Sequence, residues 1–186
     1  MAFQQLETRL EGPVLLAPDV HGDDRGFLVE TFTQDGLAEV GIADEFVQDN
    51  HSRSGRSVLR GIHFKVGGGM AKLVRCARGA IVDVVVDLRT DSPTFSEWEA
   101  FELDDAGHHQ LYIPIGFGHG FCVVSEVADV LYRCTGYYEP ELERAVAWDD
   151  PAVGIEWPES SPILSERDRS APRLADIQAE LPFRCP

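Results

Sequence analysis

The sequence predicts an all-β protein, either an antiparallel sandwich or a barrel, with short helices at its periphery. Short apolar runs recur at regular spacing from residue 58 onward, and residues typical of turns separate them. Helical periodicity is weak outside two short segments. With 186 residues, of which 44% are hydrophobic and 26% charged, the chain can bury one core, and we expect a single domain over residues 1–186.

Each predicted element follows from its local composition. The predicted helix at residues 33–40 ends before Gly41, and the one at residues 170–181 has Pro172 near its first turn and Pro182 after its end. The proline-containing stretch between residues 151 and 162 is expected to lie extended over the barrel. The predicted strands are rich in β-branched and aromatic residues and cover residues 58–64, 72–77, 80–88, 98–103, 109–113, 120–124 and 128–134.

The charge of the chain limits the partners it can bind. Sixteen basic and 32 acidic residues give a formal net charge of −16. This sign argues against nucleic acid, whose binding requires clustered Lys and Arg, and against anionic lipid. It does not argue against a small anionic ligand, because one local basic pocket can oppose the net field.

Targeting signals and cysteine pairs are not evident in the sequence. The apolar runs fall far short of the ~20 residues that a membrane helix needs, and residues 1–12 contain no apolar signal region. The four cysteines are widely spaced and form no Cys-x-x-Cys pair, so we expect reduced, mostly buried thiols rather than a zinc site. These features favour a cytoplasmic protein with no membrane partner.

Arg60 and His63 interrupt the apolar strand predicted at residues 58–64. Charged side chains are rarely buried without a partner, so this strand is expected to line a pocket. Strict alternation would place the two side chains on opposite faces of the sheet. A bulge or bend at Gly61 is therefore needed to turn both inward. The alternative is a hydrogen-bonded core histidine and a surface arginine.

Other polar residues reinforce the prediction of a pocket. Lys72 and Arg75 follow a glycine-rich loop, and cations in so acidic a chain suit an anion. His119 lies among glycines and aromatic residues, where we expect it to follow a strand and face a barrel mouth. Tyr132 lies within a predicted strand, where a tyrosine more often belongs to the core. Together these residues supply a base, an acid and cationic groups.

Two polar blocks lie in the first third of the chain. Residues 21–30 are dense in charge, and the simpler interpretation is a solvated hairpin with an Arg25–Glu30 ion pair. Residues 46–52 place amide side chains beside apolar ones, which suits recognition of a pyrimidine base or a sugar. A turn or a strand edge is the alternative for this second block.

Seven segments of the sequence resemble the dTDP-4-dehydrorhamnose 3,5-epimerase family. They occur in the family's order between about residues 13 and 174: HGDDRGFLVETF (21–32), FVQDNHSRS (46–54), VLRGIHF (58–64), KLVRCARGAIVDVVVDLRTDSPTF (72–95), YIPIGFGHGF (112–121), YRCTGYYEPELE (132–143) and WPESSPILSERD (157–168). The resemblance implies a cupin-type jelly-roll barrel and a nucleotide-sugar epimerase.

The resemblance also implies a role for each matching residue. His63 matches the general base, Asp168 the acid that pairs with it, and Tyr132 the proton donor on the other side of the sugar. Lys72 and His119 match contacts near the sugar, and Lys72 suits the enolate oxygen. The remaining matches are nucleotide and pyrophosphate contacts (Gln48, Asp49, Asn50, Arg60), residues from the partner subunit (Arg25, Glu30), the aromatic residue that stacks on thymine (Tyr138) and further substrate contacts (Glu143, Arg167).

The expected reaction follows from this resemblance. A 4-keto sugar is acidic at C3 and C5, and inversion needs a base and an acid on opposite faces of the ring. We therefore expect double epimerisation of a dTDP-4-keto-6-deoxyhexose without cofactor or metal, in a homodimer with a shared active site. The cations Arg25, Arg60, Lys72 and Arg167 are expected to gather around that site. Residues 65–71 depart from the family pattern, which affects the pocket rim and the choice between double and single epimerisation.

Three alternatives remain open at this point. A mono-epimerase of a deoxysugar pathway would share the same residues. A metal-dependent cupin would need His51, His63 and His119 to converge, although the sequence has no His-x-His motif with a following Glu. A sugar-nucleotide-binding cupin without activity would lack at least one of His63, Asp168 and Tyr132, and all three are present.

Overall fold

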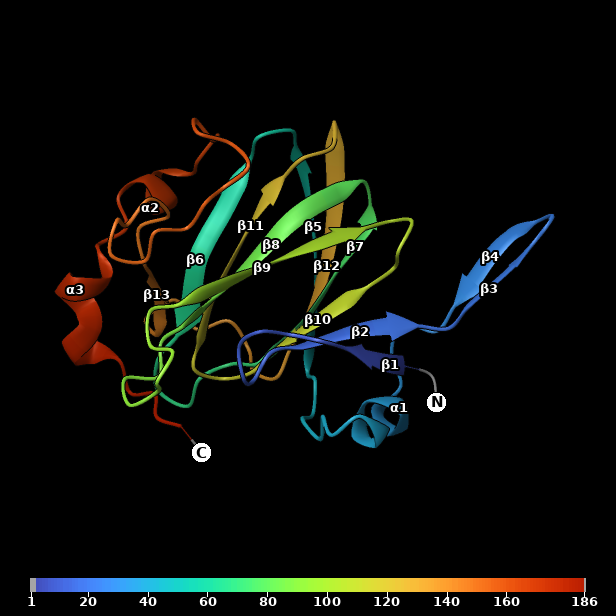
Figure 1. The fold of residues 1–186 in the computed structure, drawn as a ribbon, viewed down its shortest axis with the longest axis horizontal. Coiled ribbons are helices and arrows are strands. Elements are labelled where there is room, and N and C mark those ends of the chain that lie inside the picture. Colours follow the sequence, from blue (N-terminus) through green and yellow to red (C-terminus); the bar gives the residue numbers. More distant parts are fainter. Residues whose placement is uncertain (1–2, 186) are drawn as a thin grey trace.

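The computed structural model describes residues 3–185. Two antiparallel β-sheets face each other, and short helices and a long C-terminal segment lie outside them (Figure 1). The six-stranded sheet has the order β1 (Phe3–Leu6), β2 (Val14–Pro18), β10 (Gln110–Ile113), β7 (Lys72–Arg78), β12 (Val127–Cys134) and β5 (Gln48–Gly55). The five-stranded sheet has the order β13 (Glu143–Ala145), β6 (Leu59–Lys65), β11 (Phe117–Val123), β8 (Ala80–Asp87) and β9 (Trp98–Asp104).

The seven predicted strands are all present, as β6 to β12, so the all-β prediction is confirmed. The sequence analysis assigned no strands at β1, β2 and β13, which are short edge or peripheral strands. The polar block at residues 46–52 overlaps β5, which forms an edge of the six-stranded sheet. This agrees with the alternative given for that block, a strand edge.

The main core fills the space between the two sheets. Inward-facing residues of both sheets form one buried cluster, represented by Val74 of β7, Val85 of β8, Phe121 of β11 and Val130 of β12. Each fully buried side chain of this size contributes about 1.5–3 kcal/mol of hydrophobic free energy. The core occupies one part of the interior, and the polar side chains described below occupy another.

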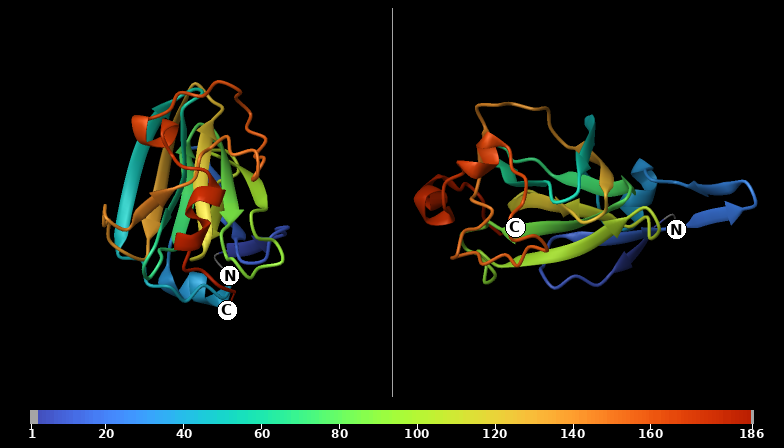
Figure 2. Two further views of the ribbon diagram at one scale, coloured as in Figure 1. Left: turned by 90° about the vertical axis from the view of Figure 1, so that its left-hand side faces the viewer. Right: turned by 90° about the horizontal axis from the view of Figure 1, so that it is seen from above.

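Two further apolar clusters cover the outer faces of the sheets. The C-terminal segment packs Leu174 and Ile177 against Val84 and Val86 on the outside of the five-stranded sheet. Val153 belongs to the same cluster, so the stretch at residues 151–162 packs over the barrel as expected. Figure 2 shows this segment against that sheet. On the outside of the six-stranded sheet, α1 (Gln34–Glu39) packs against β2 and β7.

The helices are shorter than the sequence predicts. α1 begins after Thr33, whose hydroxyl accepts a hydrogen bond from the Gly36 backbone N–H. The helix predicted at residues 170–181 comprises only α3 (Leu174–Ile177) and a 3₁₀ turn, Gln178–Glu180. Residues 171–173 are not helical, and the Pro172 carbonyl accepts a hydrogen bond from the Ala147 N–H. α2 (Glu166–Arg169) was not predicted. No helix described within residues 3–185 is long and apolar enough to cross a bilayer.

Residues 20–29 form a two-stranded hairpin, β3 (Val20–Asp23) and β4 (Gly26–Val29), that projects away from both sheets (Figure 1). The predicted hairpin is therefore confirmed, but the predicted Arg25–Glu30 ion pair is wrong. Arg25 instead pairs with Asp23 two residues away, where the tight turn brings the two side chains together. Glu30 accepts a hydrogen bond from the Thr33 hydroxyl.

Candidate active site

A cavity of about 290 Å³ lies between the two sheets, and its lining is mostly polar and charged. Strands of both sheets contribute to it, as do α2 and the residue that precedes this helix. Seven of the predicted site residues line this cavity. The lining residues are Ser52, Arg60, His63, Lys72, His119, Phe121, Tyr132, Ser165, Arg167 and Asp168.

His63 and Asp168 form a dyad at one wall of the cavity. The Nε2 atom of His63, on β6, lies 2.5 Å from the Oδ1 atom of Asp168, on α2, although 105 residues separate them in the chain. Asp168 is 3% exposed, whereas the side chain of His63 is 26% exposed and faces the cavity. Because Nε2 is engaged by the carboxylate, Nδ1 is the ring nitrogen left to act on a ligand.

Ser165 completes the surroundings of the Asp168 carboxylate. Its hydroxyl donates to Oδ2 of Asp168 at 2.7 Å and accepts from the Asp168 backbone N–H at 3.1 Å, which caps α2. Burial by itself raises the pKa of Asp168, but the hydrogen bonds from His63 and Ser165 outweigh it and lower the pKa. Asp168 is therefore a carboxylate at neutral pH, and a carboxylate favours an imidazolium on His63 after proton uptake.

A β-bulge in β6 brings Arg60 and His63 to the same cavity, as the sequence analysis required. Opposite β11, His63 faces His119 while Arg60 faces Phe121, so β6 has one extra residue between the two pairs. Gly61 occupies this position with a φ of +140°, and a Cβ here would lie 2.4 Å from the Gly120 Cα. Only glycine fits this close approach of the two strands.

Tyr132 and Lys72 enter the cavity from the opposite sheet. Tyr132 lies on β12 and Lys72 on β7, and because Lys72 is paired with Cys134, the two side chains are on the same face. Burial raises the pKa of Tyr132, which keeps the phenol protonated. Burial lowers the pKa of Lys72, an effect that the nearby Glu143 and Asp83 partly oppose.

His119 lies inside β11, so its predicted location after a strand is wrong. The flanking glycines reflect close packing rather than a turn. A Cβ at Gly118 would lie 2.5 Å from Ile62, and one at Gly120 would lie 2.8 Å from the same side chain. The His119 Nε2 lies 2.9 Å from Oδ2 of Asp83, which is fully buried. Burial lowers the pKa of His119, and Asp83 opposes this effect.

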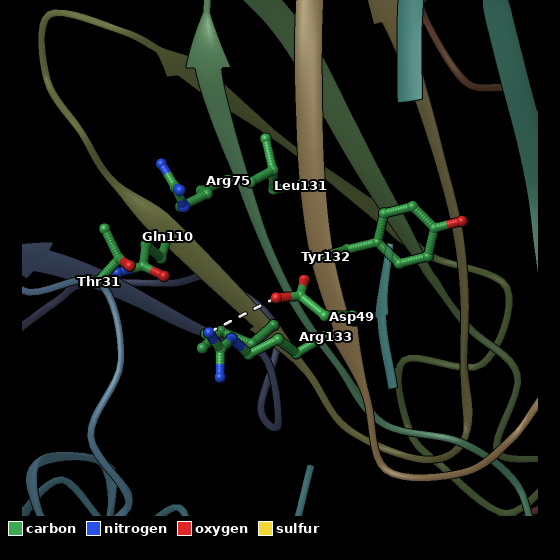
Figure 3. A pocket seen from close by; sticks show the side chains of 8 residues that line it. Thr31, Asp49, Arg75, Gln110, Leu131, Tyr132 and Arg133 are labelled. Carbon is green, nitrogen blue, oxygen red and sulfur yellow. Dashed lines mark ion pairs between the residues drawn. The ribbon is translucent and has the colours of Figure 1, made fainter. Parts of the chain in front are cut away.

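The other predicted site residues lie outside this cavity. Asp49 pairs with Arg133 on the outer face of the six-stranded sheet, where Arg75 also lies, while the ring of Tyr132 points away to the other side (Figure 3). Asn50 is paired in register with Tyr132. Gln48 binds the Tyr138 backbone, Glu143 lies on β13 opposite Lys65, and Arg25 and Glu30 lie on and beside the distant hairpin.

The three histidines proposed for a metal-dependent cupin do not converge. His51 lies on the outer face of the six-stranded sheet with its Nε2 3.2 Å from Asp129. His63 and His119 each have their own carboxylate partner inside the barrel. Within residues 3–185 no group of three His, Cys, Asp or Glu side chains is arranged to hold a metal ion.

Sequence reasoning missed two groups that support the site. Ser165 and Asp168 form an S-x-x-D pattern, which is typical of a helix N-terminus and indicates that the two side chains meet. The second missed group is Asp83. No motif in its own strand indicates a partner for this carboxylate, because the partner, His119, lies on another strand. The pairing of β8 with β11 supplies that partner.

These features are typical of a class of protein, acid–base enzymes on an antiparallel β-barrel: a His–Asp dyad joins β6 to α2, and a phenol faces it from the opposite sheet. The family profile described as dTDP-4-dehydrorhamnose 3,5-epimerase matches residues 7–176. The chain belongs to this family of isomerases.

Individual relatives agree with this assignment. The dTDP-4-dehydrorhamnose 3,5-epimerase of Pseudomonas aeruginosa is 47% identical over 91% of this chain and 96% of its own length. That of Neisseria gonorrhoeae is 48% identical over 93% of this chain, which spans 53% of the relative's length. A dTDP-4-dehydrorhamnose 3-epimerase of Streptomyces niveus is 43% identical over 91% of this chain and 83% of its own.

A solved structure confirms the fold. The crystal structure of a dTDP-6-deoxy-D-glucose-3,5-epimerase from Legionella pneumophila in complex with dTDP-4-keto-L-rhamnose superposes with a TM-score of 0.95. The two sequences are 41% identical, and the match covers 99% of each chain. The expected cupin-type jelly-roll barrel is therefore correct.

Proposed function

We propose that this protein inverts C3 and C5 of a dTDP-4-keto-6-deoxyhexose, converting dTDP-4-dehydro-6-deoxy-D-glucose to dTDP-4-dehydro-L-rhamnose. The observation that carries the proposal is the placement of His63 and Tyr132 on facing sheets of one cavity. A sugar ring bound between them has a base on one face and a proton donor on the other, which inversion requires.

His63 is the proposed general base. Its Nδ1 removes the proton at C3 or C5, carbons whose C–H bonds are acidified by the ketone at C4. Asp168 holds the ring in one tautomer through Nε2 and stabilises the imidazolium that forms. The electron pair left by the proton moves into an enolate, with its negative charge on the C4 oxygen.

Lys72 and Tyr132 are proposed to complete the reaction. A lysine ammonium in a buried site stabilises a developing oxyanion more strongly than it does in water. Tyr132 then donates its proton to the carbon from the face opposite His63. Only protons move, so no redox cofactor is needed.

The nucleotide end of the substrate is assigned to the remaining cations and polar residues. Arg60 and Arg167 line the cavity and suit the pyrophosphate, because guanidinium groups pair with phosphate oxygens. His119 contacts the sugar. Gln48, Asp49, Asn50, Tyr138 and Glu143 remain proposed contacts on the strength of the family resemblance.

The decisive experiment follows the substrate by NMR in deuterated water. We expect deuterium at both C3 and C5 and a product of inverted configuration at both carbons. Exchange or inversion at only one carbon would instead indicate a mono-epimerase, an activity that the Streptomyces niveus 3-epimerase supports as the second candidate. Absence of any exchange would contradict both.

Two variants assign the acid and the base. His63→Asn should lose about 10³-fold in turnover while dTDP still binds, because the base is lost and the nucleotide contacts remain.

Tyr132→Phe should still exchange substrate protons with solvent but yield little inverted product. Undiminished inversion by Tyr132→Phe would remove Tyr132 from the acid role.

We further propose a homodimer in which the hairpin of one subunit completes the site of the other. The hairpin exposes Phe27 and Leu28, which are 62% and 73% exposed, together with the Arg25 guanidinium. Apolar residues exposed on an isolated two-stranded hairpin favour a protein contact. Sedimentation should give a dimer, and Phe27→Ser with Leu28→Ser should lower both the dimer fraction and turnover.

The remaining proposals concern the location of the protein in the cell and the number of its domains. A cytoplasmic location is supported by the four cysteines, all of which are free thiols. A single domain over residues 1–186 is supported by the family match to residues 7–176. A stable fragment that keeps full activity after removal of β1 and β2 would contradict the single domain.

A further inference from the structure

The loop that follows β12 presents two exposed aromatic side chains beside the site. Tyr137 and Tyr138 are 66% and 57% exposed, and they follow Cys134, which is paired in register with Lys72 of the cavity. Exposed side chains on a loop gain a fixed direction only when the backbone beneath them is held. The contacts of this backbone therefore fix where the two tyrosine side chains leave the loop.

One peptide unit in this loop is held from two sides. The Tyr137 carbonyl accepts a hydrogen bond from Lys65 Nζ at 2.9 Å, and the Tyr138 N–H donates to Gln48 Oε1 at 3.1 Å. Lys65 belongs to β6 of the five-stranded sheet and Gln48 to β5 of the six-stranded sheet. The Gln48 amide is itself oriented by its 3.2 Å bond to Asn50. The loop is thus fixed to both sheets.

Lys65 is an unusual residue in this protein. The chain has only two lysines, Lys65 and Lys72, and both are buried. A buried ammonium is costly unless it is paired and hydrogen-bonded. Besides the Tyr137 carbonyl, Lys65 Nζ binds Oε1 of Glu139 at 2.5 Å, so the loop supplies both of its partners. Lys65 does not line the cavity, so we expect no contact between Lys65 and the reacting sugar.

We propose that Lys65 is a positioning residue for the nucleotide: through Tyr137 and Glu139 it fixes the loop so that its tyrosine rings receive the pyrimidine base. The proposal rests on the proposed function, because it assumes a dTDP-linked substrate. Lys65 acts through the loop, so its loss should weaken nucleotide binding and leave proton transfer unchanged. Glu139 strengthens the same contact from the solvent side.

The test compares Lys65→Met with the wild-type protein. The variant keeps the length of the side chain and removes the ammonium. We expect the Kd for dTDP and the KM for the dTDP-sugar to rise about 10-fold, with kcat within about twofold. Glu139→Gln, which weakens only one of the two contacts, should raise both constants about threefold. Arg9→Met is the matched control, because it breaks a surface ion pair with Glu97 far from the loop.

A second measurement keeps the proposal testable if Lys65→Met fails to fold. Protein labelled with ¹³C-lysine gives two side-chain signals, and Glu139→Gln identifies that of Lys65 by its shift. Addition of dTDP should move the Lys65 signal in the wild-type protein. An unmoved Lys65 signal would overturn the proposal, as would a folded Lys65→Met variant with unchanged Kd for dTDP or with loss confined to kcat.

The experiments distinguish failure of the proposed function from failure of the positioning role of Lys65. If the wild-type protein does not epimerise the dTDP-4-keto sugar, the proposed function fails, whether or not Lys65→Met weakens dTDP binding. If the wild-type protein turns over and Lys65→Met binds dTDP as tightly, only the positioning role fails.

Discussion

The chemistry of the site depends on residues that hold other residues. Asp168 keeps both of its oxygens engaged, one with His63 and one with Ser165. Without the Ser165 hydroxyl, Oδ2 would lose its donor and the carboxylate could rotate away from the imidazole. Ser165 thus holds the carboxylate that in turn orients His63.

Ser165→Ala should lower kcat about 10-fold and leave KM nearly unchanged, because the dyad loses its orientation while the nucleotide contacts remain. Loss of this donor should also raise the pKa of Asp168 and move the acidic limb of the kcat profile to higher pH. Ser165→Thr, which keeps a hydroxyl, is the control. An Ala variant with wild-type kcat and pH profile would contradict the positioning role.

Asp168 also makes stability depend on pH. Its pKa is lowered in the folded state, so the unfolded chain binds the proton first as the pH falls. Its stabilising contribution is therefore complete well above the unfolded pKa of about 3.9 and is lost as the pH falls through the folded value. Urea unfolding should show the largest stability difference between wild type and Asp168→Asn near neutrality. A difference that grows toward acid pH would contradict this sign.

At the scale of the element, the bulge in β6 decides what the cavity contains. The extra residue between Arg60 and His63 changes the alternation of the strand and turns both side chains inward. Gly118 and Gly120 of β11 allow the neighbouring strand to approach closely. The bulge therefore depends on glycines in two strands rather than on one turn.

Gly61→Ala should destabilise the fold by about 3 kcal/mol and reduce turnover, because its φ is unfavourable for alanine and its Cβ would overlap Gly120. Chemical denaturation measures the change in unfolding free energy. Gly68→Ala is the matched control, since a Cβ there meets no atom within 4 Å, and its stability should stay within about 0.5 kcal/mol of wild type. Equal stability of the two variants would contradict this account of the bulge.

At the scale of the whole molecule, the proposed function requires a chain with a net charge of −16 to bind a nucleotide diphosphate. The structure places Arg60, Lys72 and Arg167 at one cavity. Three of the four cations expected there thus gather within one subunit, and Arg25 lies on the projecting hairpin. The acidic residues elsewhere form a field that the local cations must oppose.

Raising the salt concentration from about 0.05 M to about 0.5 M should weaken dTDP binding several-fold, because screening acts on partly exposed charges. Titration calorimetry at several salt concentrations gives the slope. Arg60→Gln should bind more weakly and with a shallower slope, whereas Arg9→Met, remote from the cavity, should keep the wild-type slope. Affinity that rises with salt would show that the cations do not bind the diphosphate.

The sequence by itself determined seven of the eleven strands of the two sheets and identified His63, Tyr132 and Lys72 as candidate site residues. Strand signals are local, since alternation, β-branched residues and turn residues act within a few positions. The family resemblance added Asp168, because its motif is also local. It is for this reason that the seven predicted strands match β6 to β12.

Only the tertiary structure decided which polar groups meet. The partners His63 and Asp168, His119 and Asp83, and Lys65 and the Tyr137 carbonyl lie 105, 36 and 72 residues apart. Such contacts depend on sheet order and register, including the single extra residue at Gly61. The sequence of one segment does not say which distant segment lies beside it, and a shift of one residue in the pairing would turn every side chain of a strand to the other face.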